Sequence, residues 1–193
     1  MFKSLVPHIE QRLKKHHELY SGQCKAELWE ENCHHALVAA GFGSDWKPDF
    51  NHQSGADMRI IAGDRISNKG GQIDSESLTF SGFRTTKYKT LTDKLEFLKD
   101  KKDDYVFCLA TNKNEWESGK KIYHFIVVDS NKLDYHNQEW VDTFGKKGTG
   151  KDKHNGYSCK NEVFEAKICF SMSDQLWTTI KLNECNEHYT ITV

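Results

Sequence analysis

Two apolar runs in the middle of the chain constrain the fold more than any other feature. Residues 104–111 and 121–129 are almost continuously apolar at their centres, which is typical of neighbouring strands buried on both faces of a sheet. Residues 90–102 precede them, with leucines at helical spacing and charges in between. A helix that leads into two buried strands predicts a mixed α/β arrangement.

Further elements are predicted around this centre from the spacing of apolar residues and from turn-forming residues. They are helices over residues 5–20 and 23–40, strands over 56–61 and 65–69 with a turn between them, a closing break at Gly70-Gly71, and edge strands or a short helix over 168–180 and 189–193. The fold class expected is α/β, with a mixed central sheet flanked by helices.

One domain over residues 1–193 is expected, because no repeat or Pro-rich linker divides the chain. Within it we expect N-terminal helices in 1–41, the sheet core in 55–130 and a basic loop in 143–160. No apolar run approaches the roughly 20 residues of a membrane span. The first residues lack the apolar stretch of a signal peptide, so a cytoplasmic protein is expected.

Charge and cysteine usage exclude several classes of protein. The net charge is −1, from 27 Lys+Arg and 28 Asp+Glu, so a nucleic-acid surface would have to be local. The six cysteines form no CxxC pair, which argues against a zinc ribbon and favours free thiols. The glycine–lysine pairs at 145–146 and 150–151 lack the spacing of a phosphate-binding P-loop.

The most informative segment for function is the predicted strand pair. Asp57 lies near its start, and Ser67 and Lys69 share one face of the return strand because side chains alternate along a strand. If the strands form a hairpin, Asp57 lies beside both residues. A carboxylate next to a lysine suits Mg²⁺-dependent hydrolysis of phosphodiesters, the Asp holding the cation and the Lys orienting water and offsetting transition-state charge.

This hairpin resembles the active-site hairpin of the PD-(D/E)XK nuclease superfamily, in particular type II restriction endonucleases. The order of a Glu-bearing helix, the hairpin, a basic segment, a helix and a central apolar strand is also similar, over roughly residues 20–130. The resemblance implies a restriction-endonuclease-like fold, Mg²⁺ as cofactor, double-stranded DNA as substrate and a homodimer, because a symmetric site needs two active sites.

The sequence departs from the family pattern at one position. Two residues before Lys69 the family has a second acidic residue, and this chain has Ser67. The second ligand must then come from elsewhere, and the preceding helix offers Glu27, Glu30 and Glu31. Glu27 and Glu31 lie one turn apart on one face, and Glu30 points closer to the apolar stripe. Asp74 and Glu76 are further alternatives, and all three helix glutamates also fit solvated surface charges.

Two local segments are candidates for DNA contact. The segment 81–90 combines cations, hydroxyls and aromatics without an acid, and such side chains contact phosphates, while an arginine can also read a guanine edge. The segment 144–156 carries four lysines and one aspartate among glycines. The candidate contacts are Ser81, Arg84, Thr85, Thr86, Lys87 and Lys89 in the first segment, and Lys146, Lys147, Lys151 and Lys153 in the second.

The favoured function is therefore a sequence-specific DNA endonuclease. A structure-specific or repair nuclease on the same fold is an alternative. So is a non-catalytic DNA-binding module, for which the serine at position 67 is the best argument.

Overall fold

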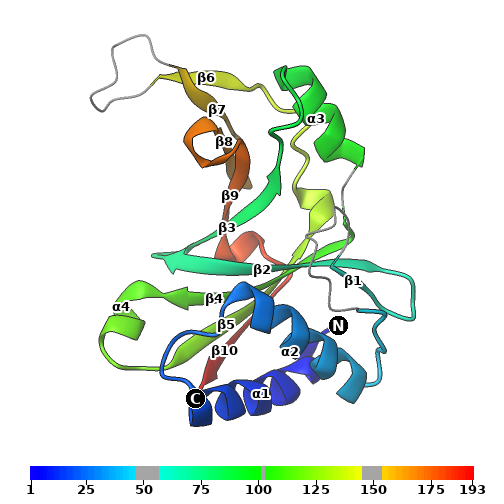
Figure 1. Ribbon diagram of the computed structural model, residues 1–193, viewed down its shortest axis with the longest axis vertical. Helices are drawn as coiled ribbons and strands as arrows, with labels where there is room; N and C mark the ends of the chain where they lie inside the picture. Colours follow the sequence, from blue (N-terminus) through cyan, green and yellow to red (C-terminus); the bar gives the residue numbers. More distant parts are fainter. Residues whose placement is uncertain (47–56, 101–102, 145–153) are drawn as a thin grey trace.

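The computed structural model describes residues 1–46, 57–100, 103–144 and 154–193. Ten strands of this part form one mixed sheet in the order β10-β5-β4-β2-β3-β9-β8-β7-β6, with the short β1 added beside β2 (Figure 1). The strands are β1 Met58–Arg59, β2 Arg65–Asp74, β3 Ser77–Arg84, β4 Tyr105–Asn112, β5 Ile122–Asp129, β6 Val141–Phe144, β7 His154–Lys160, β8 Phe164–Cys169, β9 Gln175–Lys181 and β10 Glu187–Thr192. The predicted mixed α/β class with helices around a large sheet is confirmed.

Helices lie on both faces of this sheet. They are α1 Val6–Leu19 with a short 3-10 turn before it, α2 Ala26–Ala39, α3 Leu91–Asp100 and the single-turn α4 Lys113–Glu117. In Figure 1, α1 and α2 cover the part of the sheet around β4, β5 and β10, and α3 lies at the other end of the molecule. Each face therefore has an apolar core of its own.

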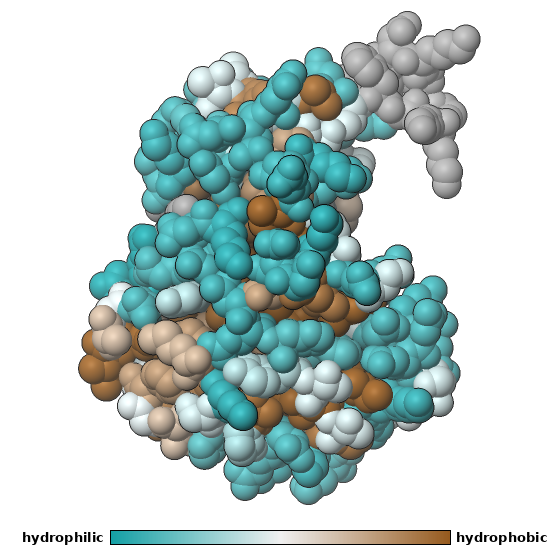
Figure 2. All heavy atoms as spheres, turned by 180° about the vertical axis from the view of Figure 1, so that it is seen from behind, coloured by the Kyte–Doolittle hydropathy of each residue, from teal (hydrophilic) through white to brown (hydrophobic). Residues whose placement is uncertain are grey.

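The two cores differ in the elements that build them. The first unites α1, α2 and one face of β2, β4, β5 and β10, and the indole N–H of its buried Trp29 donates to the carbonyl of Phe107 at 3.2 Å, which fixes α2 on β4. The second unites Leu98 of α3 with the opposite face of β4 and with β3, β8 and β9. Seen from behind, the outline is notched between the lobe that carries β6–β8 and the part that carries α1 and α2 (Figure 2).

The parallel pairing of β2 with β4 organises the centre of the sheet. Residues Ile66–Ile73 of β2 lie beside Tyr105–Asn112 of β4, and β3 and α3 form the crossover between them. Crossovers of this length are needed because parallel strands run in the same direction. The helix predicted over 90–102 and the strands predicted over 104–111 and 121–129 are confirmed within the described residues.

The predicted break at Gly70-Gly71 is wrong, because β2 continues to Asp74. A Cβ on Gly71 would lie 2.4 Å from the Cys108 sulfur and 2.8 Å from a Leu78 methyl carbon. The glycine is therefore required by close packing within the second core, and it does not end the strand.

One strand was not predicted, and two other predictions are corrected by the structure. The unpredicted strand is β3, over residues 77–84, which lies between β2 and β9. The strand β9 is internal, and only β10 and β6 end the row of strands. The basic loop predicted over 143–160 includes the end of β6 and all of β7, and its residues 145–153 lie outside the described part of the chain.

Candidate active site

The site begins at a gap in the pairing of β2. On one side β2 pairs without interruption with β4. On the other side β1 pairs with Arg65 and Ile66, and β3 pairs only from Gly71 onward. None of the described strands pairs with the backbone of residues 67–70 on that side. Asp57, directly before β1, covers the gap, since its Oδ2 accepts a hydrogen bond from the Asn68 N–H.

Three donors of β2 converge on the Asp57 carboxylate. Besides the Asn68 N–H, Lys69 Nζ donates to Oδ2 at 3.3 Å and the Ser67 hydroxyl lies 3.4 Å from the same oxygen. The side chains of Asp57 and Lys69 are 21% and 22% exposed, so both remain reachable from solvent. The predicted proximity of Asp57, Ser67 and Lys69 is confirmed.

The helix α2 approaches Asp57 from the other face of the sheet. Burial raises the pKa of the Cys33 thiol well above its usual range, and the charges of Asp57 and Glu30 add to this shift. Cys33 therefore lies near both carboxylates. Glu30, one turn before it, is half-buried.

Glu31 does not join the site, contrary to its predicted role as a catalytic residue and metal ligand. Its side chain is 53% exposed and lies 3.8 Å from the His35 imidazole. The reason is the rotation of α2, which turns Trp29, Cys33 and Leu37 into the core. With 100° per residue, position 31 then faces solvent. The side chain of Glu27, the other predicted metal ligand on α2, lies outside the described part.

A second carboxylate that the sequence did not indicate lies beside the cluster. Asp103, directly before β4, is only 6% exposed. It lines a small cavity of about 50 Å³ together with Ser67 and Lys69. Burial and the nearby Asp57 charge raise the pKa of Asp103 to about 6, while Lys69 and Arg65 oppose the shift. The only available signal was its place just before the apolar run 105–109.

The rest of this cavity is apolar, apart from Ser130 and the tyrosine hydroxyl. Its other lining residues are Phe80, Gly82, Phe83, Leu98, Val106, Ser130, Leu133, Tyr135 and Leu176. Low polarity strengthens the electrostatic interactions of the charged groups at its edge. Among the described residues, no three His, Cys, Asp or Glu side chains form a ready-made metal cluster, so any cation would be held by fewer side chains and by water.

The predicted DNA-contacting segment after β3 divides into exposed and buried positions. Arg84, Thr86, Lys87 and Lys89 are exposed, and Ser81 is half-exposed. Thr85 is fully buried, and its hydroxyl donates to the backbone carbonyl of Asp174 at 2.8 Å. Thr85 is therefore not available for the phosphate contact predicted from the sequence.

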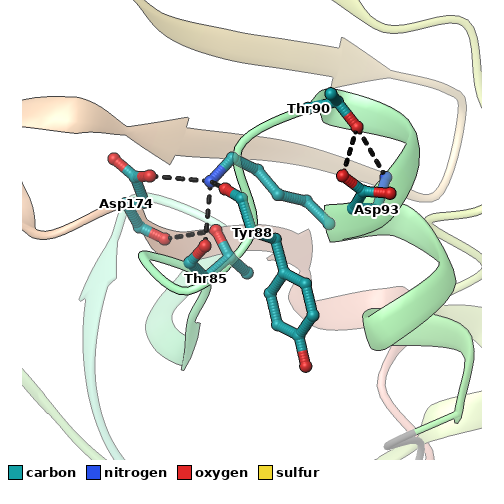
Figure 3. A network of polar contacts seen from close by, with 6 residues as sticks. Thr85, Tyr88, Thr90, Asp93 and Asp174 are labelled. Atoms are coloured by element: carbon teal, nitrogen blue, oxygen red, sulfur yellow. Dashed lines mark hydrogen bonds and ion pairs between the residues drawn. The ribbon is translucent and has the colours of Figure 1, made fainter.

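A buried lysine fixes this segment, and Figure 3 shows the labelled Thr85, Tyr88 and Asp174 of the polar network to which it belongs. Lys94 of α3 is 1% exposed, and its ammonium donates to the carbonyls of Thr85 and Tyr88 at 2.9 and 2.6 Å and to Asp174 Oδ2 at 2.7 Å. These three contacts use all three donors of the ammonium group. No sequence pattern distinguished Lys94, since a lysine between leucines on a helix is usually a surface residue.

The four lysines predicted in the second basic segment, Lys146, Lys147, Lys151 and Lys153, lie outside the described residues. None of the described helices is long and apolar enough to cross a membrane. No known protein family matches the sequence, and no curated protein matches it. The function must therefore be inferred from the site itself.

Proposed function

We propose that the protein is a Mg²⁺-dependent endonuclease that cleaves double-stranded DNA at a specific sequence, on a restriction-endonuclease-like fold. One observation carries the proposal: a partly exposed lysine and a partly exposed aspartate lie 3.3 Å apart where none of the described strands pairs with this side of β2. An acidic residue beside a lysine on adjacent strands is the arrangement that the resemblance to PD-(D/E)XK nucleases implies.

The donor chemistry of the site fits Mg²⁺. This cation takes hard oxygen ligands, retains several waters and uses one or two carboxylates. Asp57 supplies one such carboxylate, and its Oδ1 accepts no hydrogen bond from the described residues. When bound, Mg²⁺ would polarise a phosphate oxygen and stabilise the charge of the transition state.

Lys69 provides the second part of the chemistry. Its single contact with Asp57 leaves other ammonium donors free to orient a water molecule and to bind a non-bridging phosphate oxygen. Attack by the water oxygen on phosphorus breaks one phosphorus–oxygen ester bond. The products are a phosphate end and a hydroxyl end, with a water proton transferred to the leaving oxygen.

The exposed cations after β3 suit phosphate contact. Arg84 is the last residue of β3, the strand that borders the gap, and Lys87 and Lys89 follow it. Neutralisation of phosphates is the main source of affinity for DNA. Cleavage of both strands at a symmetric site further implies a homodimer. Sedimentation of the free protein would measure that state.

The test is incubation of the purified protein with long plasmid or phage DNA, with Mg²⁺ and separately with EDTA. Discrete Mg²⁺-dependent bands are expected, and sequencing of the ends would give the site. A smear would instead indicate a structure-specific or nonspecific nuclease. Intact DNA in both reactions would contradict catalysis and favour a DNA-binding module.

Substitutions would connect cleavage to the site. Asp57→Ala and Lys69→Ala are each expected to abolish cleavage and to leave DNA binding, measured by gel shift, intact. Cleavage that persists in both variants would remove the site assignment.

A further inference from the structure

The position that should supply a second acid at the site is occupied by a hydroxyl. Ser67 is 3% exposed, and its Oγ lies 3.4 Å from Asp57 Oδ2. A serine hydroxyl is neutral and already engaged with Asp57, so it adds no charge for a divalent cation. With Lys69 also at this carboxylate, a cation held by Asp57 alone would face an opposing positive charge.

Asp103 is a buried carboxylate that lines the same cavity as Ser67 and Lys69. Its role in the fold is unexplained. Asp103 is 6% exposed and accepts no hydrogen bond from the described residues. Leu98, Val106 and Leu133 form the apolar wall next to it. Burial of an ionised carboxylate without donors is costly unless a cation or a proton compensates it.

Asp57 and Asp103 lie on opposite sides of β2. Asp57 covers the β2 edge that faces β1 and β3, whereas Asp103 leads into β4, on the other side of β2. Ser67 and Lys69 lie on β2 between these two strands and line the cavity with Asp103. Two carboxylates thus flank one short stretch of β2.

We propose that Asp103 is the second carboxylate ligand of the divalent cation, in place of the acid that position 67 lacks. Two carboxylates balance the charge of a divalent cation, and a hard cation with retained waters suits a cavity that holds few side-chain oxygens. What the cation does there rests on the proposed function, but its binding to Asp57 and Asp103 does not.

The other acids near the site are unsuitable for this role. Asp104, the next residue, is 46% exposed and is held by Arg65, whose backbone N–H donates to Asp104 Oδ2 at 2.7 Å. Glu31 faces solvent on α2. Asp104 therefore offers a matched control: it has the same chemistry one residue away but lies outside the cavity lining.

The experiment titrates the free protein with Mn²⁺ and measures unbound Mn²⁺ by electron paramagnetic resonance, without DNA. Wild type is expected to bind one ion per chain. Asp103→Asn and Asp57→Asn should each weaken binding by at least about 10-fold, since the loss of a residue that only orients a metal ligand already costs this much. Asp104→Asn should bind as wild type. Melting curves check folding, and Asp103→Ser repeats the test if the Asn variant unfolds.

The results separate this inference from the proposed function. Wild-type affinity in Asp103→Asn, an equal loss in Asp104→Asn, or no Mn²⁺ binding by wild type would overturn the assignment of Asp103. The expected binding pattern, together with DNA that stays intact under all conditions, would support the cation site and contradict the nuclease.

Discussion

Two lysine–aspartate pairs in the described part of the chain have surroundings that differ sharply. Lys94 is 1% exposed and satisfies all three of its donors, two of them with backbone carbonyls and one with Asp174. Lys69 is 22% exposed and makes one contact, 3.3 Å long, with Asp57 among the described residues. A saturated ammonium has no donor left for a ligand. The number of unused donors, and not the presence of an ion pair, therefore separates a structural lysine from a candidate catalytic one.

The largest expected effect is a loss of stability when the pair of Lys94 and Asp174 is broken. Lys94→Met should lower the free energy of unfolding by about 3–5 kcal/mol, because it leaves a charged carboxylate and two carbonyls without a donor. Urea unfolding would measure this loss. The control Lys99→Met, at an exposed position of the same helix, should change stability by no more than about 0.5 kcal/mol. Equal effects of the two would contradict the structural role of Lys94.

For the pair of Lys69 and Asp57 we expect a large effect on cleavage and a small effect on stability. Lys69→Met should reduce the cleavage rate by roughly 100- to 1,000-fold, the range found when one transition-state donor is removed. Its free energy of unfolding should change by less than about 1 kcal/mol, since a half-exposed ion pair contributes little. Single-turnover cleavage and urea unfolding on the same preparation test both parts. A variant that cleaves normally would make Lys69 a surface residue.

The surroundings of Lys69 should also contribute a pH dependence to the stability. Burial, with the Asp57 charge, raises the pKa of Asp103 from 3.8 to about 6. The folded state thus binds its proton more tightly, and this contribution is complete below pH 4 and lost as the pH rises through 6. In EDTA, the stability of wild type relative to Asp103→Asn should fall over this window by about 2–3 kcal/mol. A constant difference would contradict the shift.

The smallest effect should come from the exposed cation nearest β3. Arg84→Ala should weaken DNA binding and lower the slope of log affinity against log salt by about 1, because one phosphate contact is lost. Fluorescence anisotropy at several salt concentrations would measure it. Thr86→Ala, an exposed neutral neighbour, should leave the slope unchanged. An unchanged slope in both would place Arg84 away from the DNA.

The sequence predicted the parts of the site that are close together in the chain. Asp57, Ser67 and Lys69 were expected to meet because strand alternation and a short turn determine their positions locally. Asp103 was not predicted, since its approach depends on the parallel pairing of β2 and β4 across α3, which no local pattern encodes. Lys94 was missed for a similar reason, because its partner Asp174 lies in a distant turn.

The predictions that were wrong concern features that tertiary packing determines. Helicity of residues 26–39 was predictable from their spacing, but the rotation of α2 is set by Trp29 against β4, and it turns Glu31 to solvent. Gly70-Gly71 suggested a break, yet Gly71 packs against Cys108 and Leu78 inside a continuous strand. In both cases the sequence pattern was compatible with more than one arrangement, and tertiary packing determined which one forms.

The parallel pairing of β2 with β4 also determines when the site is completed during synthesis of the chain. A ribosome adds about 5–20 residues per second, so the hairpin with Asp57 and Lys69 emerges seconds before β4 does. Until β4 pairs with Ile66–Ile73, the growing chain has no wall on that side of Lys69 and no Asp103 beside it. The site is therefore complete only after β4 has been synthesised and has paired with β2.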